Sequence, residues 1–309
     1  MGALPGHLVS TQGAIDMHFH SAPCLFQRLA TDRQVAEAAS RMGFGGLQFK
    51  CHHENTVSRA LALQRDFPEL HLFGGIVLNT YVGGINPKAV EAALLLGAKS
   101  VWLPTIDSVH HVLVHGGTGQ YETQSAGGST SKCGISAVRD GMITAEAKTV
   151  FELIAEHGAI LGTSHQSYDE LSVIIPAARQ IGVKKISLTH PFYVTPGLTL
   201  PQIQEFINMG AIAEFGYCTV SPMWASATLR QVAGAIKTLG AEHCILMSDG
   251  GQRHNPIPPE ALRIFAQSLF ELGVQEGDID TMIRKNPARL LGLEPDEVRP
   301  SARGVHDNA

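Results

Sequence analysis

Side chains that can bind a metal ion follow four short apolar stretches of this chain. His18 and His20 end the first stretch, and His165, His190 and Asp249 end three others. In an extended strand, residues i and i+2 point to the same face, so His18 and His20 can bind one ion together. Neutral imidazoles combined with a carboxylate suit zinc and similar divalent ions. The residue types and their spacing therefore predict a metal centre.

An ion bound by these side chains would support hydrolysis. A divalent ion lowers the pKa of a bound water from about 15.7 to about 7, and so supplies hydroxide at neutral pH. Asp249 is placed to accept the proton of that water and to pass it to the leaving group. With two ions, His165 and His190 would complete the coordination of the second; with one ion, one of these histidines would stabilise the oxyanion. The expected reaction is hydrolysis of an ester, lactone or amide bond in a small molecule.

Eight strands alternating with eight helices are predicted to position these residues. The predicted strands are 14–20, 46–51, 71–79, 99–105, 159–165, 184–190, 211–217 and 243–249. The predicted helices are 32–42, 55–66, 87–97, 144–157, 168–181, 199–209, 226–239 and 258–272. Such alternation favours parallel strands with right-handed crossovers, and eight repeats fit an α/β fold of the closed (β/α)8, or TIM barrel, type. Every candidate ligand lies at the C-terminal end of its strand, where such barrels place their active sites.

One connection of the predicted barrel is unusually long. About 38 residues, 106–143, separate the fourth strand from the next helix, and a loop of that length is rare in a compact domain unless it works as a lid or binding loop. The segment is rich in Gly, Ser and Thr and contains His110, His111 and His115. Within it, Asp140-Gly141 predicts a hairpin turn. We expect residues 109–143 to form a lid over the barrel mouth; a surface excursion without function is the alternative.

The ligand pattern resembles that of the amidohydrolase superfamily. It combines the His-x-His of the first strand, single histidines after the fifth and sixth strands, and an aspartate after the eighth. The segment 285–293, KNPARLLGL, is similar to one that often follows the last barrel strand in those enzymes. Residues 49–53, 83–87 and 101–105 resemble a poorly characterised branch of metal-dependent hydrolases within the superfamily. The resemblance spans residues 14–293 and implies a metal-dependent hydrolase with one or two divalent ions, zinc first and manganese or iron as alternatives.

The chain departs from that superfamily at one position. Members with two metal ions usually place a carboxylated lysine at the end of strand four, where this chain has Thr105 and no lysine. Lys50 instead ends the second predicted strand. It could be carboxylated and bridge two ions, remain an ammonium that holds an anionic substrate or polarises an oxygen, or be a structural ion-pair partner. Cys51 is the next candidate ligand, but neighbouring strand residues face opposite ways, so Lys50 and Cys51 cannot both point into the mouth.

Four further side chains have open roles. His52 and His53 follow the second strand, and one of them could reach the site, although solvated loop histidines are the simpler reading. Glu214 lies in the otherwise apolar seventh strand, and since burying a carboxylate without a partner is costly, we expect it to meet a partner inside the barrel. Asp16 shares a face with His18 but lies deeper, which suits an acceptor that orients an imidazole.

Composition excludes several classes of partner. A net charge of −5 without a long basic block gives no electrostatic footprint for nucleic acid. No run of 18 apolar residues is present, so we expect no membrane span. The first residues lack a charged segment followed by an apolar one, which argues against a secretory signal. The partner we expect is a small-molecule substrate, and a homo-oligomer is left open.

Size and cysteine usage indicate a single intracellular domain. The chain has 309 residues, 44% of them hydrophobic, and we expect one barrel domain over residues 1–309, although two smaller domains would also fit this length. Its five cysteines are scattered and form no C-x-x-C pair, which favours a reducing compartment, the cytoplasm. These cysteines are Cys24, Cys51, Cys133, Cys218 and Cys244.

Two other function classes compete with hydrolysis. The first is a decarboxylase or other lyase of the same superfamily, in which the ion holds a carboxylate and no water attacks; a single ion and an ammonium at Lys50 would favour it. The second is a metal-binding protein without turnover. The ligands are expected at an open barrel mouth beside a long insert, and this placement argues against it. Activity against lactones, esters and acidic aromatic compounds separates the three.

Overall fold

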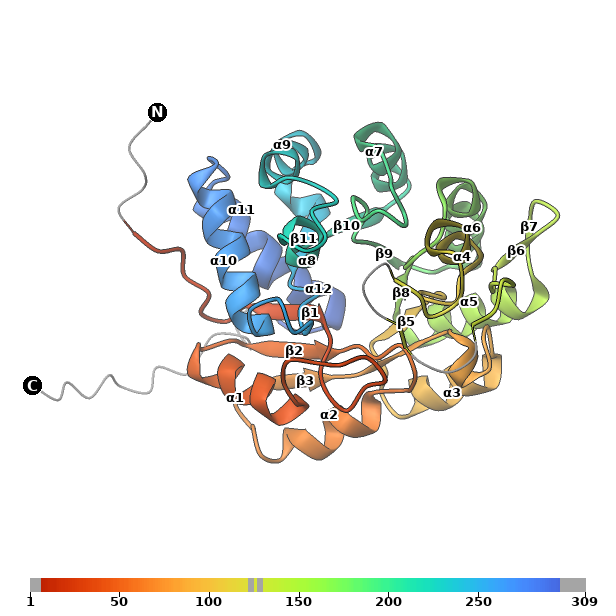
Figure 1. Ribbon diagram of the computed structural model, residues 1–309, viewed down its shortest axis with the longest axis horizontal. Coiled ribbons are helices and arrows are strands. Elements are labelled where there is room, and N and C mark those ends of the chain that lie inside the picture. Colours follow the sequence, from red (N-terminus) through yellow and green to blue (C-terminus); the bar gives the residue numbers. More distant parts are fainter. Residues whose placement is uncertain (1–6, 122–124, 127–129, 295–309) are drawn as a thin grey trace, which may run out of the picture.

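Strands and helices alternate along the chain in the predicted order. A computed structural model describes residues 7–121, 125–126 and 130–294 of the protein. Its main strands are β1 (Ile15–Phe19), β2 (Gly46–Phe49), β3 (His71–Phe73), β4 (Gly75–Val77), β5 (Ser100–Trp102), β8 (Ile160–Gly162), β9 (Lys185–Thr189), β10 (Ala211–Gly216) and β11 (Cys244–Met247). They pair in parallel in two sheets, ordered β1-β2-β3 and β11-β10-β9-β8-β5-β4 (Figure 1). The predicted α/β fold with parallel strands is confirmed.

The eight predicted helices are all present, and they surround the strands (Figure 1). They are α1 (Asp32–Arg41), α2 (Val57–Gln64), α3 (Pro87–Leu95), α5 (Ala145–His157), α6 (Tyr168–Ile181), α7 (Leu200–Asn208), α9 (Leu229–Leu239) and α10 (Pro258–Glu271). Local sequence explains where several begin. Thr31, Ser167 and Thr228 each accept a backbone N–H three residues on, and the Gln or Glu at that position accepts the N–H of the capping residue in return.

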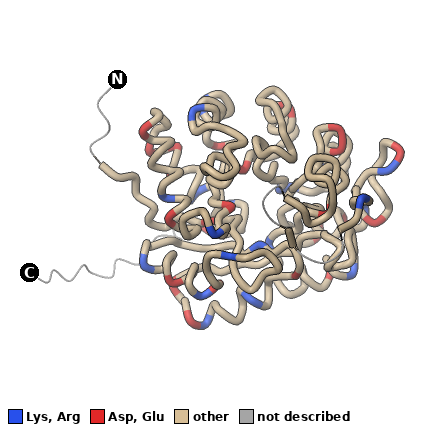
Figure 2. The backbone as a smooth tube through the Cα atoms, in the orientation of Figure 1, with Lys and Arg blue, Asp and Glu red and all other residues tan. Residues whose placement is uncertain are grey.

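Shorter helices lie in connections and at the C-terminal end. They are η1 (Thr80–Val82), α4 (Val109–His115), α8 (Tyr217–Val220), η2 (Ala241–His243), α11 (Glu276–Asp280), η3 (Thr281–Lys285, a π-helix) and α12 (Asn286–Leu291). Within the described residues, no helix is both long and apolar enough to cross a bilayer. Lys and Arg are interspersed with Asp and Glu around the outer helices (Figure 2).

The two sheets are joined at one edge by a single stretch of chain. Residues 71–79 were predicted as one strand, which the structure divides at Gly74: β3 pairs with β2, and β4 pairs with β5. A Cβ on Gly74 would lie 2.5 Å from the backbone nitrogen of Val57. The start of α2 therefore packs into the break, and only glycine leaves room for it.

Hydrogen bonds beyond the strand ends join the two sheets at the other edge. Asp249 N donates to His18 O at 2.8 Å, and His20 N donates to Gly250 O at 2.8 Å. Deeper down, the Asp16 carboxylate accepts the backbone N–H of Ser248 at 3.0 Å. The C-terminal end of β1 therefore lies beside the segment that follows β11.

Two glycines leave room for the side chain of Trp102 on β5. A Cβ on Gly162 would lie 2.1 Å from Trp102 Cδ1, and one on Gly75 would lie 2.5 Å from Trp102 Cζ3. Glycines on both neighbouring strands thus make room for the indole. The indole also contacts the side chain of Lys50, whose Nζ lies 5.3 Å from the ring centroid.

The long insert contains more regular structure than predicted. Helix α4 begins at the N-cap Ser108, whose side chain accepts the N–H of His111, and ends at Gly116 with φ of 84°. The predicted hairpin is present as β6 (Val138–Arg139) and β7 (Met142–Ile143), and its turn residue Asp140 has φ of 51°. Residues 122–124 and 127–129 of the expected lid lie outside the described residues, as do residues 1–6 and 295–309 of the expected domain.

Candidate metal centre

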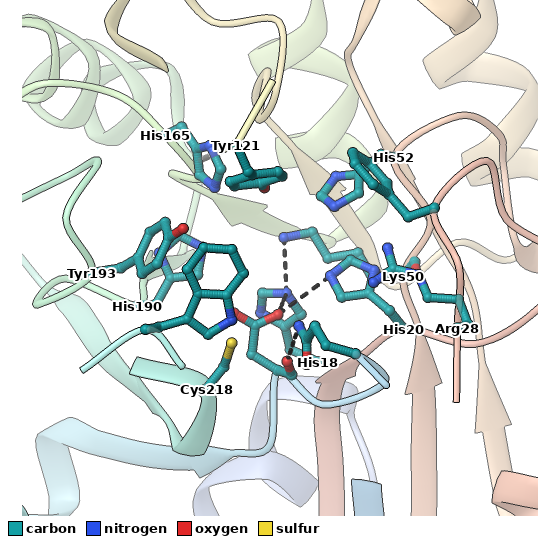
Figure 3. A pocket seen from close by; sticks show the side chains of 14 residues that line it. His18, His20, Arg28, Lys50, His52, Tyr121, His165, His190, Tyr193 and Cys218 are labelled. Carbon is teal, nitrogen blue, oxygen red and sulfur yellow. Dashed lines mark hydrogen bonds and ion pairs between the residues drawn. The ribbon is translucent and has the colours of Figure 1, made fainter. Parts of the chain in front are cut away.

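Three side chains from opposite ends of the chain converge above Trp102. His18 lies in β1 and His20 directly follows it (Figure 3). Asp249 comes just after β11. Asp249 Oδ1 lies 3.2 Å from His18 Nε2 and 3.3 Å from His20 Nε2, and all three side chains are buried. Ligand atoms held 2.0–2.1 Å from a tetrahedral zinc ion lie about 3.3 Å apart. The spacing therefore fits three donors around one divalent ion.

An acceptor oxygen lies beside Nδ1 of each imidazole. His20 Nδ1 lies 3.1 Å from the carbonyl of Lys50, and His18 Nδ1 lies 3.4 Å from Glu214 Oε1. Each acceptor favours the proton on Nδ1, which leaves the Nε2 lone pair directed towards Asp249. Ser187 Oγ donates to the other oxygen of Glu214 at 2.8 Å. Glu214 thus meets partners inside the barrel, as predicted.

The protonation states of His20, Asp249 and Glu214 suit a cation, whereas contacts of His18 with Asp249 and Glu214 outweigh burial and raise the pKa of its imidazole. Burial lowers the pKa of His20 to about 3, so its imidazole is neutral at neutral pH. Burial opposes ionisation of Asp249, but contacts with His18 and His20 outweigh it and hold the pKa of the carboxyl well below its usual range. In the same way, contacts with His18 and Lys50 outweigh burial and keep the pKa of Glu214 below its usual value. Neutral imidazoles and ionised carboxylates are the forms that bind metals.

Asp16 has a different partner from the one expected. We expected its carboxylate to orient an imidazole, but Asp16 Oδ1 accepts the backbone N–H groups of His18 at 3.3 Å and Ser248 at 3.0 Å. Glu214 on β10 takes the place beside the His18 ring instead. Asp16 lies two residues deeper on β1, at the level of the join with β11, so it reaches backbone rather than the ring.

Lys50 points into the same cavity. Its Nζ lies 3.0 Å from His18 Nε2, and burial lowers the pKa of its amine to about 8, with Asp249 and Glu214 partly opposing that change. Within the described residues, no carboxylate lies in ion-pair contact with Lys50, which weakens the structural ion-pair reading. Cys51 faces away from the cavity, towards His53, so the prediction that Lys50 and Cys51 point in opposite directions is correct.

His165 and His190 line the cavity without joining the group of three. The ring centroids of His165 and His190 are 5.1 Å apart, and that of His190 lies 5.8 Å from His18. All five residues that the sequence singled out therefore surround one cavity, and His18, His20 and Asp249 have their donor atoms within 4.8 Å of one another. The roles predicted for His165 and His190, completing a second ion's shell or stabilising an oxyanion, stay predictions.

A histidine of the insert sets the orientation of His165. His111 lies on α4. Its Nε2 is 2.8 Å from the carbonyl oxygen of Gln120, and its Nδ1 is 2.9 Å from Nδ1 of His165. The Gln120 carbonyl can only accept a hydrogen bond, so the ring proton of His111 is on Nε2. His111 Nδ1 then accepts a hydrogen bond from Nδ1–H of His165. His165 Nε2 is then left with its lone pair free for a ligand. The sequence located His111 in the insert but gave no signal for this contact.

Strained backbone marks three strand ends of the site. Ser164, His190 and Asp249 have φ angles of 55°, 33° and 44°, in the left-handed region that non-glycine residues rarely adopt. Each such residue costs about 1–3 kcal/mol, and strain of this kind gathers at functional sites. In addition, Nδ1 of His190 and Oγ of Ser164 are buried without a hydrogen-bond partner in the described part of the chain. An orphaned imidazole nitrogen in the cavity fits a ligand-binding role.

Several other residues complete the cavity, which has a volume of about 30 Å³. His52 reaches it: the ring stacks on His20 with centroids 4.6 Å apart, and Nδ1 lies 2.9 Å from Thr105 Oγ1. His53 does not line the cavity. Loop residues that sequence reasoning missed also line it, because no periodicity encodes the path of a loop. They are Phe26, Arg28, Tyr121 and Gln252, and Cys218 of the short helix α8 lines it as well.

Comparisons with known proteins agree with this fold. The model of a family of unknown function, DUF6282, matches residues 13–214, more than half of the chain. A search of curated proteins found no match. Among solved structures, an amidohydrolase from Pseudomonas aeruginosa is 13% identical with a TM-score of 0.60, covering 93% of this chain and 97% of that chain. A putative 2-pyrone-4,6-dicarboxylic acid hydrolase from Pseudomonas putida is 17% identical with a TM-score of 0.57, covering 93% and 99%.

A third structural match comes from a different reaction class. The 2,6-dihydroxybenzoate decarboxylase from Rhizobium is 11% identical with a TM-score of 0.55, covering 91% of this chain and 99% of that chain. At these identities the matches establish the fold, which is that of amidohydrolase-like proteins. They confirm the predicted likeness and span both hydrolases and a decarboxylase.

Proposed function

We propose that this chain, which belongs to the family of unknown function DUF6282, is a metal-dependent hydrolase of small molecules. The observation that carries the proposal is the convergence of His18, His20 and Asp249, with both imidazoles oriented by acceptors on the far side of their rings. Solved hydrolases of the same fold support it. The bond cleaved would be an ester, lactone or amide.

The protein's own groups have distinct roles in this proposal. A divalent ion, zinc first and manganese or iron as alternatives, would supply a Lewis acid and lower the pKa of an attacking water to about 7. His18, His20 and Asp249 would hold one ion, and a second would draw on His165, His190 and Lys50. Asp249, ionised at neutral pH, would accept the proton of the water and return it to the leaving group.

Cationic and aromatic groups in the cavity favour an anionic substrate. Arg28 lines the cavity, and its Nη2 is buried without a hydrogen-bond partner among the described residues. Lys50 offers a second cation when it is protonated. Buried cations need a partner, and a guanidinium pairs well with a carboxylate. Tyr121 and Trp224 on the cavity wall, with ring centroids 5.5 Å apart, suit a flat apolar portion of the same substrate.

A decarboxylase is the second candidate, and the same two cations favour it. If Lys50 remains an ammonium and Arg28 holds a carboxylate, the site can bind an aromatic acid without activating water. If Lys50 is instead carboxylated, it can bridge two ions, which favours hydrolysis. Carboxylation requires the neutral amine, and the lowered pKa of Lys50, about 8, makes that form accessible near neutral pH.

The test combines metal content with turnover. Protein purified from metal-supplemented growth should contain about one or two equivalents of a transition metal by elemental analysis. It should hydrolyse members of a panel of esters, lactones and amides that carry a carboxylate. The double variant His18→Ala/His20→Ala should lose the ion of this centre and all turnover.

The matched control is His157→Ala/His243→Ala, which removes two exposed histidines from the outer surface and should change neither property. Full turnover by His18→Ala/His20→Ala would remove these residues from the mechanism. Release of carbon dioxide from aromatic acids, without hydrolysis of any panel member, would replace the hydrolase by the decarboxylase.

A further inference from the structure

A second group of metal-binding side chains lies outside the cavity just described. Cys24 lies in the connection between β1 and α1, and Cys51 and His53 follow β2. The two sulfur atoms and one imidazole nitrogen lie within 4.8 Å of one another. His53 Nδ1 is 3.9 Å from Cys24 Sγ and 3.8 Å from Cys51 Sγ. None of these three side chains has a role in the proposed hydrolysis.

The spacing of these atoms fits a tetrahedral thiophilic ion. Zinc binds thiolate sulfur at about 2.3 Å and imidazole nitrogen at about 2.0–2.1 Å, so a sulfur and a nitrogen on one tetrahedral ion lie about 3.6 Å apart. The observed separations of 3.8 and 3.9 Å exceed that value only slightly. A small inward shift of the three side chains would therefore complete three corners of a tetrahedron.

The surroundings favour a thiolate at Cys24. Arg28 Nε donates to Cys24 Sγ at 3.2 Å, and a donor of this kind stabilises a negative sulfur. The pKa of the Cys24 thiol is lowered by hydrogen bonding with Cys51, His53 and Arg28, which outweighs its partial burial. Hydrogen bonding with Cys24, together with burial, raises the pKa of the Cys51 thiol. Thiolates are the form of cysteine that binds zinc, so an ion taken up by Cys24 would displace the proton of Cys51.

Packing holds the cluster in place and separates it from the cavity. The His53 ring packs edge-on against Tyr81 with centroids 4.5 Å apart and also contacts Phe26 at 5.8 Å. Cys51 faces away from the cavity that Lys50 enters, so the two groups share no ligand. Cys24 is only partly buried, which leaves a fourth coordination position accessible to water.

From this arrangement we propose that Cys24, Cys51 and His53 form a second divalent-cation site, selective for thiophilic ions such as Zn²⁺. The site ties the β1–α1 connection to the β2–α2 connection. His52 lies between two of its ligands in the sequence and stacks on His20 at 4.6 Å. An ion held by the cluster would therefore hold His52 in place, and His20, a ligand of the proposed hydrolytic centre, packs against His52.

Cobalt substitution tests this site with a readout that does not depend on activity. Titration of reduced, metal-free protein with Co²⁺ should produce a near-ultraviolet thiolate-to-cobalt charge-transfer band. Cys24→Ser and Cys51→Ser should each abolish the band. Cys218→Ser, which removes a sulfur that lines the main cavity, should retain it. His18→Ala/His20→Ala should also retain it, so loss of the hydrolytic centre and loss of this site are distinguishable.

A second measurement needs only the wild-type protein. Saturating Zn²⁺ should protect Cys24 and Cys51 from alkylation, whereas exposed Cys133 should react equally with and without the ion. The proposal is overturned if no band forms in the wild type, if the band survives Cys24→Ser, or if it vanishes in Cys218→Ser. Equal alkylation of the two cysteines with and without Zn²⁺ would also overturn it, as would a Cys24–Cys51 disulfide in reductant-free protein.

Discussion

At the scale of single residues, a second carboxylate, Glu214, contacts one of the candidate metal ligands. Glu214 is buried on β10, where its two oxygens contact the His18 imidazole and the Ser187 hydroxyl. A carboxylate in this position fixes the tautomer of a ligating histidine and increases its basicity. Glu214 therefore explains why a charged side chain is present in a strand that is otherwise apolar.

Removing only the charge of Glu214 tests this role. Glu214→Gln keeps the shape of the side chain but loses the carboxylate, so we expect metal affinity at the centre to fall about 10–100-fold. The measurement is competition with a chelator of known affinity. Glu152→Gln, which removes an exposed carboxylate paired with Lys148 on α5, is the control and should leave the affinity unchanged. Equal affinities for the two variants would contradict the role given to Glu214.

At the scale of elements, helix α4 connects the insert to the site. Its residue His111 accepts a hydrogen bond from His165 Nδ1 and donates one to the carbonyl of Gln120, another residue of the insert. Ser108, the N-cap of the helix, also donates its hydroxyl to the carbonyl of His165. The helix thus contacts both the backbone and the ring of one candidate ligand, which makes the insert part of the site's framework.

If His111 positions His165, substitutions of His111 should lower metal affinity to different degrees. His111→Ala should weaken metal binding about tenfold, because His165 then has no acceptor to hold its tautomer. His111→Asn should restore part of the affinity, since the amide oxygen can accept the same proton, whereas a purely structural role would not be rescued in this way. The control is the neighbouring variant His110→Ala, with unchanged affinity. An increase in KM with unaltered metal affinity would instead place His165 on the substrate.

The elements themselves could be predicted because their signals are local. Alternating apolar runs, capping residues and terminal glycines located all eight helices and the strand stretches to within a few residues. Helix α4 was not predicted because its sequence, VHHVLVH, is short and gives no clear apolar face. The break at Gly74 escaped because it depends on the approach of Val57 from another element.

The site could be predicted only as far as the fold determines it. A barrel brings the C-terminal ends of its strands together, so His18, His20, His165, His190 and Asp249 were expected to meet. No comparable rule predicts which residues of the loops reach the site. The path of the β1–α1 connection, which brings Arg28 to the cavity, and the position of Tyr121 had no signal in the sequence.

At the scale of the whole molecule, the contact between the first and last strands lies beneath the site and should contribute to the stability of the fold. Asp16 accepts backbone N–H groups from both sides of this contact, and burial raises the pKa of its carboxyl to about 7 despite these hydrogen bonds. In the unfolded chain the same group has its ordinary pKa of 3.8. Between these two values the folded protein keeps a proton on Asp16 that the unfolded chain has released.

This difference predicts the sign of a pH effect on stability. For an acid whose folded pKa is raised, stabilisation is complete below pH 3.8 and is lost as the pH rises towards about 7, because the unfolded state binds fewer protons there. The free energy of unfolding of the metal-free wild type, relative to Asp16→Asn, should therefore fall by a few kcal/mol between about pH 4 and pH 8. Urea denaturation in the presence of a chelator measures both proteins. Asp140→Asn, in the hairpin turn, is the control and should follow the wild type at every pH. A constant difference between wild type and Asp16→Asn would show that Asp16 keeps the same charge when the barrel unfolds.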